Sequence, residues 1–116
     1  MTTPRCLCYV LSLLLSFGCR GRDSITLTLE NAGPVALDSV VVFTTGRSYL
    51  VGRLPGGSSK RVRIGADGES HIEIEHGRST RHRLRVGTYF ESGYGGKIDV
   101  RLTVDSILAI ADSIRI

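Results

Sequence analysis

Apolar and polar residues alternate along most of the chain after residue 24, and this period of two limits the fold more than any other feature. Residues 25–30 read ITLTLE, residues 71–76 read HIEIEH, and residues 97–104 read KIDVRLTV. Alternation places successive side chains on opposite faces of a strand, whereas an amphipathic helix repeats every three to four residues. Turn clusters such as PGGSS at 55–59 interrupt the pattern at intervals of about 8–12 residues, which is typical of all-β sandwiches and barrels.

Seven or eight strands account for residues 25–116, which we predict to form one domain. Residues 38–45, DSVVVFTT, carry a continuous apolar run, which indicates a central strand covered on both faces. Residues 107–116 are ambiguous, because their isoleucines also fit one side of a helix. β-branched residues recur to the C-terminus, so we favour two short strands with a turn near Asp112. The predicted fold is a single sandwich of seven to eight antiparallel strands.

The charge pattern excludes one large class of partner. The chain has 116 residues, 41% of them hydrophobic, and a net charge of +4, which is typical of one globular domain. Basic residues are interleaved with Asp and Glu, and no block of five like charges occurs. No motif of the nucleic-acid-binding folds is present, so we expect no nucleic acid partner.

The first nineteen residues differ from the rest of the chain. Arg5 precedes an uncharged run at residues 6–17, CLCYVLSLLLSF. As a helix this run rises about 18 Å, well short of the ~30 Å of hydrocarbon that a membrane span crosses. A buried core helix is the alternative, but the flexible, charged segment GCRGRDS follows at once. A basic start, a short apolar region and a small residue before the break predict a secretory signal peptide at residues 1–18, cleaved after Gly18.

The junction at residues 15–19, LSFGC, resembles the lipobox of bacterial lipoprotein precursors. Gly18 matches the small residue before the cysteine, whereas Ser16 and Phe17 depart from the motif's commonest residues. The resemblance implies that Cys19 is linked to diacylglycerol, becomes the new N-terminus and is acylated again. Residues 19–24 are then the lipidated cysteine and a polar tether, and the domain is anchored to a membrane of the cell envelope. Arg20 is not the Asp of an inner-membrane retention signal, which favours the outer membrane if the host has one.

Cysteine usage agrees with this interpretation. Cys6 and Cys8 leave with the signal peptide, and Cys19 carries lipid, so the mature chain has no free thiol and no disulfide. A metal-binding or redox pair at Cys6 and Cys8 is disfavoured by their apolar flanks. A plain secreted domain, cut at the same site but never acylated at Cys19, stays open as an alternative.

Residues 29–64 carry a second resemblance. Their turns follow the N-x-G … V-x-V … L-x-x-G-x-S cadence of bacterial immunoglobulin-like domains of the CARDB and adhesion-related type. Asn31 and Gly33 match the first turn, and Leu54, Gly57 and Ser58 match the second approximately. The resemblance implies an immunoglobulin-like sandwich. A fold does not determine a function, so it implies no activity.

The segment HIEIEHGRSTRHRLR at residues 71–85 concentrates ionisable side chains. A hairpin turning through residues 77–79 would set Glu75 opposite Arg81, and Glu73 opposite Arg83. A hairpin through residues 65–69 would set the same two carboxylates opposite two further arginines, Arg61 and Arg63. We therefore predict an acidic strand between two basic ones, a solvated sheet face in which opposite charges fix the register.

A metal site, formed by one or the other of two groups of side chains, is the alternative interpretation of this segment. His71, Glu73 and Glu75 share one face of a strand, and His76 and His82 share the other. Arginines on the neighbouring strands would occupy the carboxylates and repel a cation, so we predict no metal and no cofactor. The histidine pair is expected at the rim of the sandwich. No nucleophile elbow of the G-x-S-x-G type occurs, and we predict no catalytic residues.

Three of the aromatic residues, Tyr89, Phe90 and Tyr94, lie within six positions. Tyrosine adds a large contact area at a small entropic cost, so this cluster is the predicted partner-facing patch. The sequence as a whole predicts a non-enzymatic envelope lipoprotein with a binding or structural role. A small envelope metal-binding protein or enzyme that uses the His71, Glu73 and Glu75 strand is the alternative.

Overall fold

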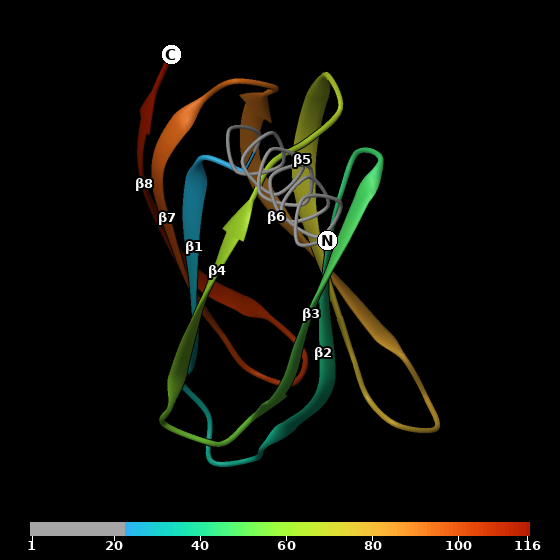
Figure 1. The fold of residues 1–116 in the computed structure, drawn as a ribbon. Helices are drawn as coiled ribbons and strands as arrows, with labels where there is room; N and C mark the ends of the chain where they lie inside the picture. The colour runs from blue at the N-terminus through green and yellow to red at the C-terminus, as the bar shows by residue number, and fades with distance from the viewer. Residues whose placement is uncertain (1–22) are drawn as a thin grey trace, which may run out of the picture.

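The computed structural model describes residues 23–116 as eight strands arranged in two sheets. The predicted signal peptide, residues 1–18, and the tether as far as residue 22 lie outside the described residues. Figure 1 labels the strands. They are β1 (Ile25–Asn31), β2 (Leu37–Thr44), β3 (Arg47–Leu54), β4 (Ser59–Ile64), β5 (Glu69–His76), β6 (His82–Glu91), β7 (Gly95–Leu102) and β8 (Ile107–Arg115).

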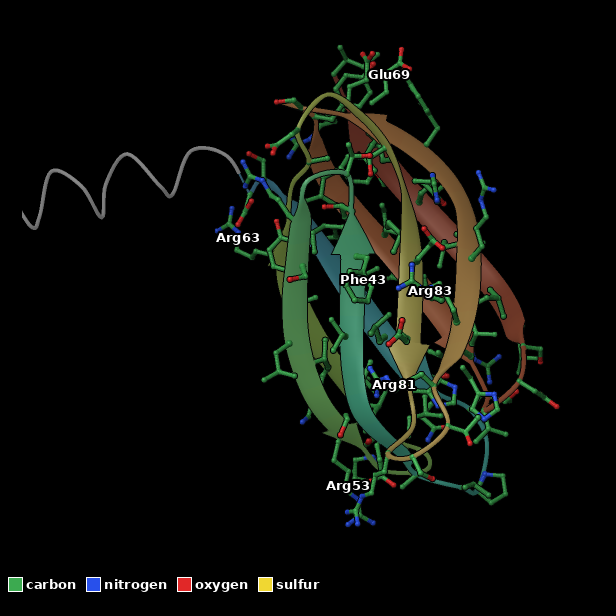
Figure 2. All side chains as sticks on the ribbon, turned by 90° about the vertical axis from the view of Figure 1, so that its right-hand side faces the viewer. Phe43, Arg53, Arg63, Glu69, Arg81 and Arg83 are labelled. Carbon is green, nitrogen blue, oxygen red and sulfur yellow. The ribbon has the colours of Figure 1, made fainter. Side chains whose placement is uncertain are left out.

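The two sheets have the strand orders β4-β1-β7-β8 and β3-β2-β5-β6, and they pack face to face as a β-sandwich. Figure 2 looks onto the β3-β2-β5-β6 sheet, with the other sheet behind it. The all-β prediction and the strand number are confirmed. One detail of pairing is wrong, because β1 and β7 run parallel. The chain crosses between sheets four times, and β1 and β7 enter their shared sheet from the same end.

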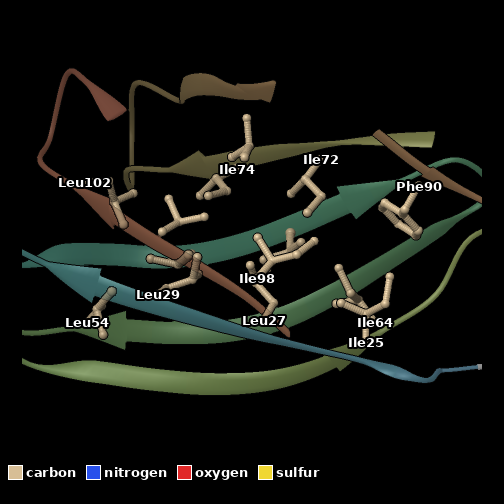
Figure 3. Packing of buried hydrophobic residues seen from close by; sticks show 14 of the residues in the cluster. Ile25, Leu27, Leu29, Leu54, Ile64, Ile72, Ile74, Phe90, Ile98 and Leu102 are labelled. Atoms are coloured by element: carbon tan, nitrogen blue, oxygen red, sulfur yellow. The ribbon is translucent and has the colours of Figure 1, made fainter. Parts of the chain in front are cut away.

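The core lies between the sheets and follows the sequence alternation. On β1 every second residue is buried, beginning with Ile25, Leu27 and Leu29. Ile72 and Ile74 of β5 face them from the opposite sheet (Figure 3). The buried polar side chains also have partners, since every buried side-chain nitrogen and oxygen in the described part of the chain is hydrogen-bonded. The interior formed by residues 23–116 therefore holds no unpaired polar side-chain atom.

Asn31 joins the turn at residues 32–36 to the turn at residues 55–58. Its side chain is fully buried, donates to the carbonyls of Val35 (2.7 Å) and Leu54 (3.0 Å), and accepts from the amide of Gly33 (3.1 Å). The amide of Gly57 donates to the Asn31 carbonyl at 2.8 Å. The two turns therefore lie side by side at one end of the sandwich.

Strand β2 is central in its sheet, as predicted, but it is covered on one face only. Val40 and Val42 are fully buried, whereas Val41 and Phe43 point outward and are half-buried. Ser39 has a positive φ of 49° at an irregularity in the pairing with β3. A continuous apolar run cannot by itself distinguish a second covering layer from an outward face that other side chains partly shield.

The C-terminal segment is one continuous strand, so the predicted turn near Asp112 is wrong. β8 pairs antiparallel with β7 from Leu102–Ile107 to Gly95–Arg115, and Asp112 sits within the ladder opposite Ile98. Ile98 and Val100 of β7 are buried on the inner face of this ladder, whereas Asp112, opposite Ile98, is exposed because β8 is the edge strand. The polar pair Asp112-Ser113 therefore marks an exposed edge, not a break.

Candidate functional site

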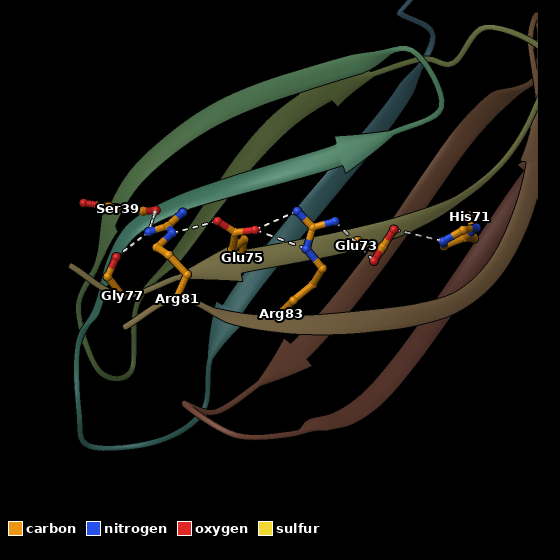
Figure 4. A network of polar contacts seen from close by, with 7 residues as sticks. All are labelled: Ser39, His71, Glu73, Glu75, Gly77, Arg81 and Arg83. Carbon is orange, nitrogen blue, oxygen red and sulfur yellow. Dashed lines mark hydrogen bonds and ion pairs between the residues drawn. The ribbon is translucent and has the colours of Figure 1, made fainter. Parts of the chain in front are cut away.

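A charged network covers the outer face of β5 and β6, where the sequence placed its ionisable cluster (Figure 4). Glu75 lies at its centre. Its Oε1 accepts from Nε of Arg81 at 2.8 Å, and its Oε2 accepts from Nη2 of Arg83 at 2.7 Å. Hydrogen bonds from Arg81 and then from Arg83 lower the pKa of the Glu75 carboxyl below its usual range. The carboxylate is thus held ionised and occupied by its neighbours.

The network continues in both directions from Glu75. Arg83 also reaches Oε1 of Glu73 at 3.5 Å, and Nε2 of His71 lies 3.2 Å from the other oxygen of Glu73. The guanidinium of Arg83 stacks over the ring of Phe43, with Cζ 4.6 Å from the ring centroid. The network therefore ties β6 to β5 and, through Phe43, to β2 (Figure 2).

Two predicted pairings are corrected here. The β5–β6 hairpin turns through residues 77–81, so Glu75 pairs with Arg83 and Glu73 with Arg85, a shift of two residues. Charge alternation fixes the face but not the length of the loop. Arg81 instead reaches Glu75 from the turn, and also donates to the carbonyls of Ser39 (2.9 Å) and Gly77.

Among the described strands, the acidic strand β5 has one basic neighbour, β6. β4, with Arg61 and Arg63, pairs with β1 in the other sheet, and β2 takes the place beside β5. Glu73 and Glu75 therefore lie opposite Phe43 and Val41 on that side. The segment between β4 and β5 crosses between the sheets, and alternation carries no information about which strand becomes a neighbour.

The candidate metal ligands are engaged with other partners. Each of His71, Glu73 and Glu75 takes part in the network, and the arginines supply the positive charge that the carboxylates need. Among residues 23–116, no group of three or more His, Cys, Asp and Glu side chains is placed to hold a metal ion. What the network does chemically is neutralise its own charges and fix three strands.

The histidine pair, His76 and His82, lies at the sandwich rim, where β5 ends and β6 begins. The rings of His76 and His82 are 5.4 Å apart between centroids. His76 is buried, and its Nε2 donates to the carbonyl of Val104 at 2.8 Å, whereas His82 is exposed. Burial lowers the pKa of the His76 imidazole, so the neutral form is favoured. The bond joins β5 to the turn between β7 and β8.

The predicted aromatic patch does not form as a unit. Phe90 is fully buried and is the largest side chain of the core, so it cannot face a partner. Tyr94 packs partly against the core and donates its hydroxyl to Glu91 at 2.9 Å. Tyr89 is 54% exposed beside a shallow hollow that His71 and Arg85 also line, and Glu91 raises the pKa of its hydroxyl. Successive side chains of β6 lie on opposite faces of the sheet, so Tyr89 faces solvent and Phe90 faces the core.

The lipidation site and cleavage site, Cys19 and Gly18, lie outside the described residues, but the entry point of the domain is defined. Asp23 accepts from Nη1 of Arg47 at 2.5 Å and from the hydroxyl of Tyr49 at 3.0 Å. The Tyr49 oxygen in turn accepts from the amide of Gly65 at 2.9 Å, and burial raises the pKa of this hydroxyl. The sequence could not reveal this cluster, because its members lie 24 to 26 residues from Asp23 along the chain.

An open groove of about 450 Å³ runs over the outer face of the other sheet. Thr26 and Thr28 of β1 form part of its lining between longer side chains, among them Arg61 of β4 and Lys97 of β7. Across the same sheet, Arg101 donates to Glu30 at 2.6 Å. Most of the described residues that line it are polar or charged, with both signs present, and the groove is open to solvent.

No helix in residues 23–116 is long and apolar enough to cross a membrane. No protein-family model, curated protein or solved structure matches this chain.

Proposed function

We propose that this chain is the precursor of a cell-envelope lipoprotein, in which residues 1–18 are removed and acyl chains on Cys19 tether the sandwich to a membrane surface. The order of three segments carries the proposal: an uncharged run at 6–17, the lipobox-like LSFGC, and a folded domain that begins at Ile25. Each methylene of the acyl chains contributes about 0.8 kcal/mol when buried in lipid, so two or three chains anchor a small domain firmly.

The docked position of Asp23 makes the tether short. Only residues 20–22 separate Cys19 from Asp23, whose carboxylate is held by Arg47 and Tyr49. Four residue steps span at most about 14 Å when fully extended. The sandwich therefore stays close to the lipid surface and does not range freely above it.

The short tether also orients the domain. We define the anchor end as the end that carries Asp23, the β2–β3 turn at 45–46 and the loops at 65–68 and 92–94 (top of Figure 1). This end faces the membrane. The opposite end faces away, and it carries the turns at residues 32–36, 55–58, 77–81 and 103–106.

The role that fits such a domain is binding or structural, not catalytic, and the partner is another component of the envelope. The charged network neutralises the carboxylates on the outer face of β5, and the groove over the second sheet is open and polar. A domain with these properties presents its faces and edges to macromolecules. In a host with two membranes, Arg20 after Cys19 favours the outer one.

The direct test is the intact mass of the mature chain after expression in a bacterium that processes lipoproteins. We expect a chain of residues 19–116 that carries diacylglycerol and a further acyl group on Cys19, and that sediments with membranes. Cys19→Ser should abolish both the added lipid mass and the cleavage that follows lipidation. Cys8→Ser is the matched control and should change neither, because that residue is removed.

Two results would contradict the proposal. A mature chain that starts at Cys19 without added lipid and stays soluble would make this a plain secreted domain. A stable folded chain that still begins at Met1 would show that residues 1–18 are not a removable signal, and both location and role would have to be abandoned.

A further inference from the structure

Strand β8 has an outer edge with which no other described strand pairs. It is the last strand of the order β4-β1-β7-β8, and within residues 23–116 only β7 pairs with it (Figure 1). The pairing runs the full length of the strand, from Ile107 to Arg115, and is irregular only near Leu108. The outer edge of β8 therefore exposes a row of backbone N–H and C=O groups to which a further strand can hydrogen-bond.

The side chains of β8 do not protect this edge. Leu108 is 54% exposed and Ile110 is 41% exposed, and Ile116 follows directly after the strand at 98%. No charged residue occurs between Ile107 and Ala111. Natural sheets usually block a free edge with charges, prolines or covering segments, so an exposed and apolar edge of this length indicates a pairing surface.

The three other edge strands carry the protection that β8 lacks. Each of them holds at least two basic side chains. These are Arg47 and Arg53 on β3, Lys60, Arg61 and Arg63 on β4, and Arg83 and Arg85 on β6. Two copies meeting through any of these edges would place like charges close together, which opposes pairing. β8 carries one Asp and one Arg, and no net charge.

The direction of the free peptide groups follows from the hydrogen bonds of β7. The Leu102 carbonyl accepts from Ala32, next to β1, so it points away from β8. The peptide groups of successive residues in a strand point to opposite edges, so those of the odd-numbered residues of β7 point toward β8. Asp99 and Lys97 therefore hydrogen-bond to their partners Ala111 and Ser113. The outward peptide groups of β8 are then those of Ile110, Asp112 and Ile114.

We propose that the outer edge of β8 pairs antiparallel with β8 of a second copy of this chain. A two-fold axis perpendicular to the sheet keeps the apolar inner faces of both copies on one side. It sets even-numbered residues opposite even-numbered ones, and these are the residues whose peptide groups point outward. The register centred on Ala111 pairs the strand along its whole length and places no like charges opposite each other.

The pairing joins two four-stranded sheets into one continuous sheet across the dimer. It covers Ile110 and Leu108 from the side and supplies a partner for each outward peptide group. It needs no lipid, so it goes beyond the proposed function and can be tested separately from it. A membrane tether would raise the local concentration of copies and favour the dimer.

Site-specific photo-crosslinking of the full chain tests this surface in cells. Two differently tagged copies are co-expressed, each with a photoreactive amino acid at position 113, an exposed residue of β8. We expect an adduct that contains both tags. The same amino acid at Thr80, an exposed residue in the β5–β6 turn, is the matched control and should give no such adduct.

Two variants separate pairing from folding. Ile110→Lys puts a charge on the edge, and Asp112→Pro removes an outward N–H without touching the bonds to β7, so both should abolish the adduct. Circular dichroism should show an unchanged β-sheet spectrum for both variants. Absence of the two-tag adduct in the unaltered chain, or an adduct only with a different protein, would overturn the proposal whatever the lipid state of Cys19.

Discussion

The outer face of β5 and β6 and the outer edge of β8 lie on different sheets and are built in opposite ways. On β5 and β6, Glu75 accepts from two arginines, and one of them also stacks on Phe43 of β2. On β8, Leu108 and Ile110 are exposed, and no described strand pairs with the outer edge. The charged face is complete within one copy of the chain, whereas the β8 edge has no partner strand among residues 23–116.

The difference separates stability from recognition. Opposite charges across a ladder contribute about 0.2–1 kcal/mol per pair and fix the register, so the β5–β6 face organises its own sheet. Bare peptide groups and apolar side chains contribute only when a second strand covers them. The charged cluster of β5 and β6 thus has a structural role, whereas the less charged strand β8 is the proposed surface for contact with a second copy.

The largest expected difference in stability is between the buried side of β6, which lies beneath the charged face, and the exposed edge of β8. Phe90→Ala on β6 removes the largest fully buried side chain and should lower the free energy of unfolding by about 3–5 kcal/mol. Ile110→Ala on β8 removes a side chain that is 41% exposed, and should cost about 1 kcal/mol or less. Urea unfolding of the monomeric protein measures both. Equal losses would break the comparison.

Two neighbouring prolines distinguish the inner and outer sides of β8. Ser113→Pro removes an N–H that bonds to Lys97 of β7 and leaves a carbonyl unpaired, so it should destabilise the fold by about 1–3 kcal/mol. Asp112→Pro removes an outward N–H and should cost clearly less. Thermal unfolding of the two proline variants measures the loss of stability caused by each. A larger loss for Asp112→Pro would reverse the assigned direction of the peptide groups.

The charged face should show itself in the pH dependence of stability. The pKa of Glu75 is lowered in the folded chain, so its contribution is present above the ordinary value of 4.5 and is lost as pH falls through the folded pKa. Glu75→Gln should therefore lower the melting temperature at neutral pH, and the difference from the unaltered chain should shrink in acid. A difference in melting temperature that stays constant with pH would contradict the ionic role of Glu75.

The smallest effect comes from the rim histidine. Burial lowers the pKa of His76 below 6.5, so protonation opposes folding. Its contribution is present above pH 6.5 and is lost as pH falls below that value, because the unfolded chain then binds more protons. His76→Gln should remove this part of the pH dependence, whereas His82→Gln should keep it. NMR titration of the His76 ring, with a midpoint at or above 6.5, would rule the assignment out.

Much of the fold could be predicted from alternation. The buried residues of β1, Ile25, Leu27 and Leu29, are those that the period of two places on one face. The turn chemistry of Asn31 and Gly33 also holds, because the Asn side chain organises that turn. The face of a strand that is buried and the residues that form a turn depend on neighbouring residues in the chain. Both can therefore be predicted from a single sequence.

Neighbours and loop lengths could not be predicted in the same way. Nothing in residues 60–76 shows that β4 joins β1 while β5 joins β2, because a crossover and a hairpin begin with similar turn residues. The β5–β6 turn was two residues longer than expected, which moved Glu75 opposite Arg83. The cluster of Asp23, Arg47 and Tyr49 joins distant segments and had no signal in the sequence.

Hydrogen exchange of the individual β8 amides in the full chain tests the central claim most directly. The amides of Ala111 and Ser113 bond to β7 and should be protected at every protein concentration. We predict that the amides of Ile110, Asp112 and Ile114 exchange fast in dilute solution and become protected as the concentration rises. Fast exchange at those three positions at every concentration would contradict the account.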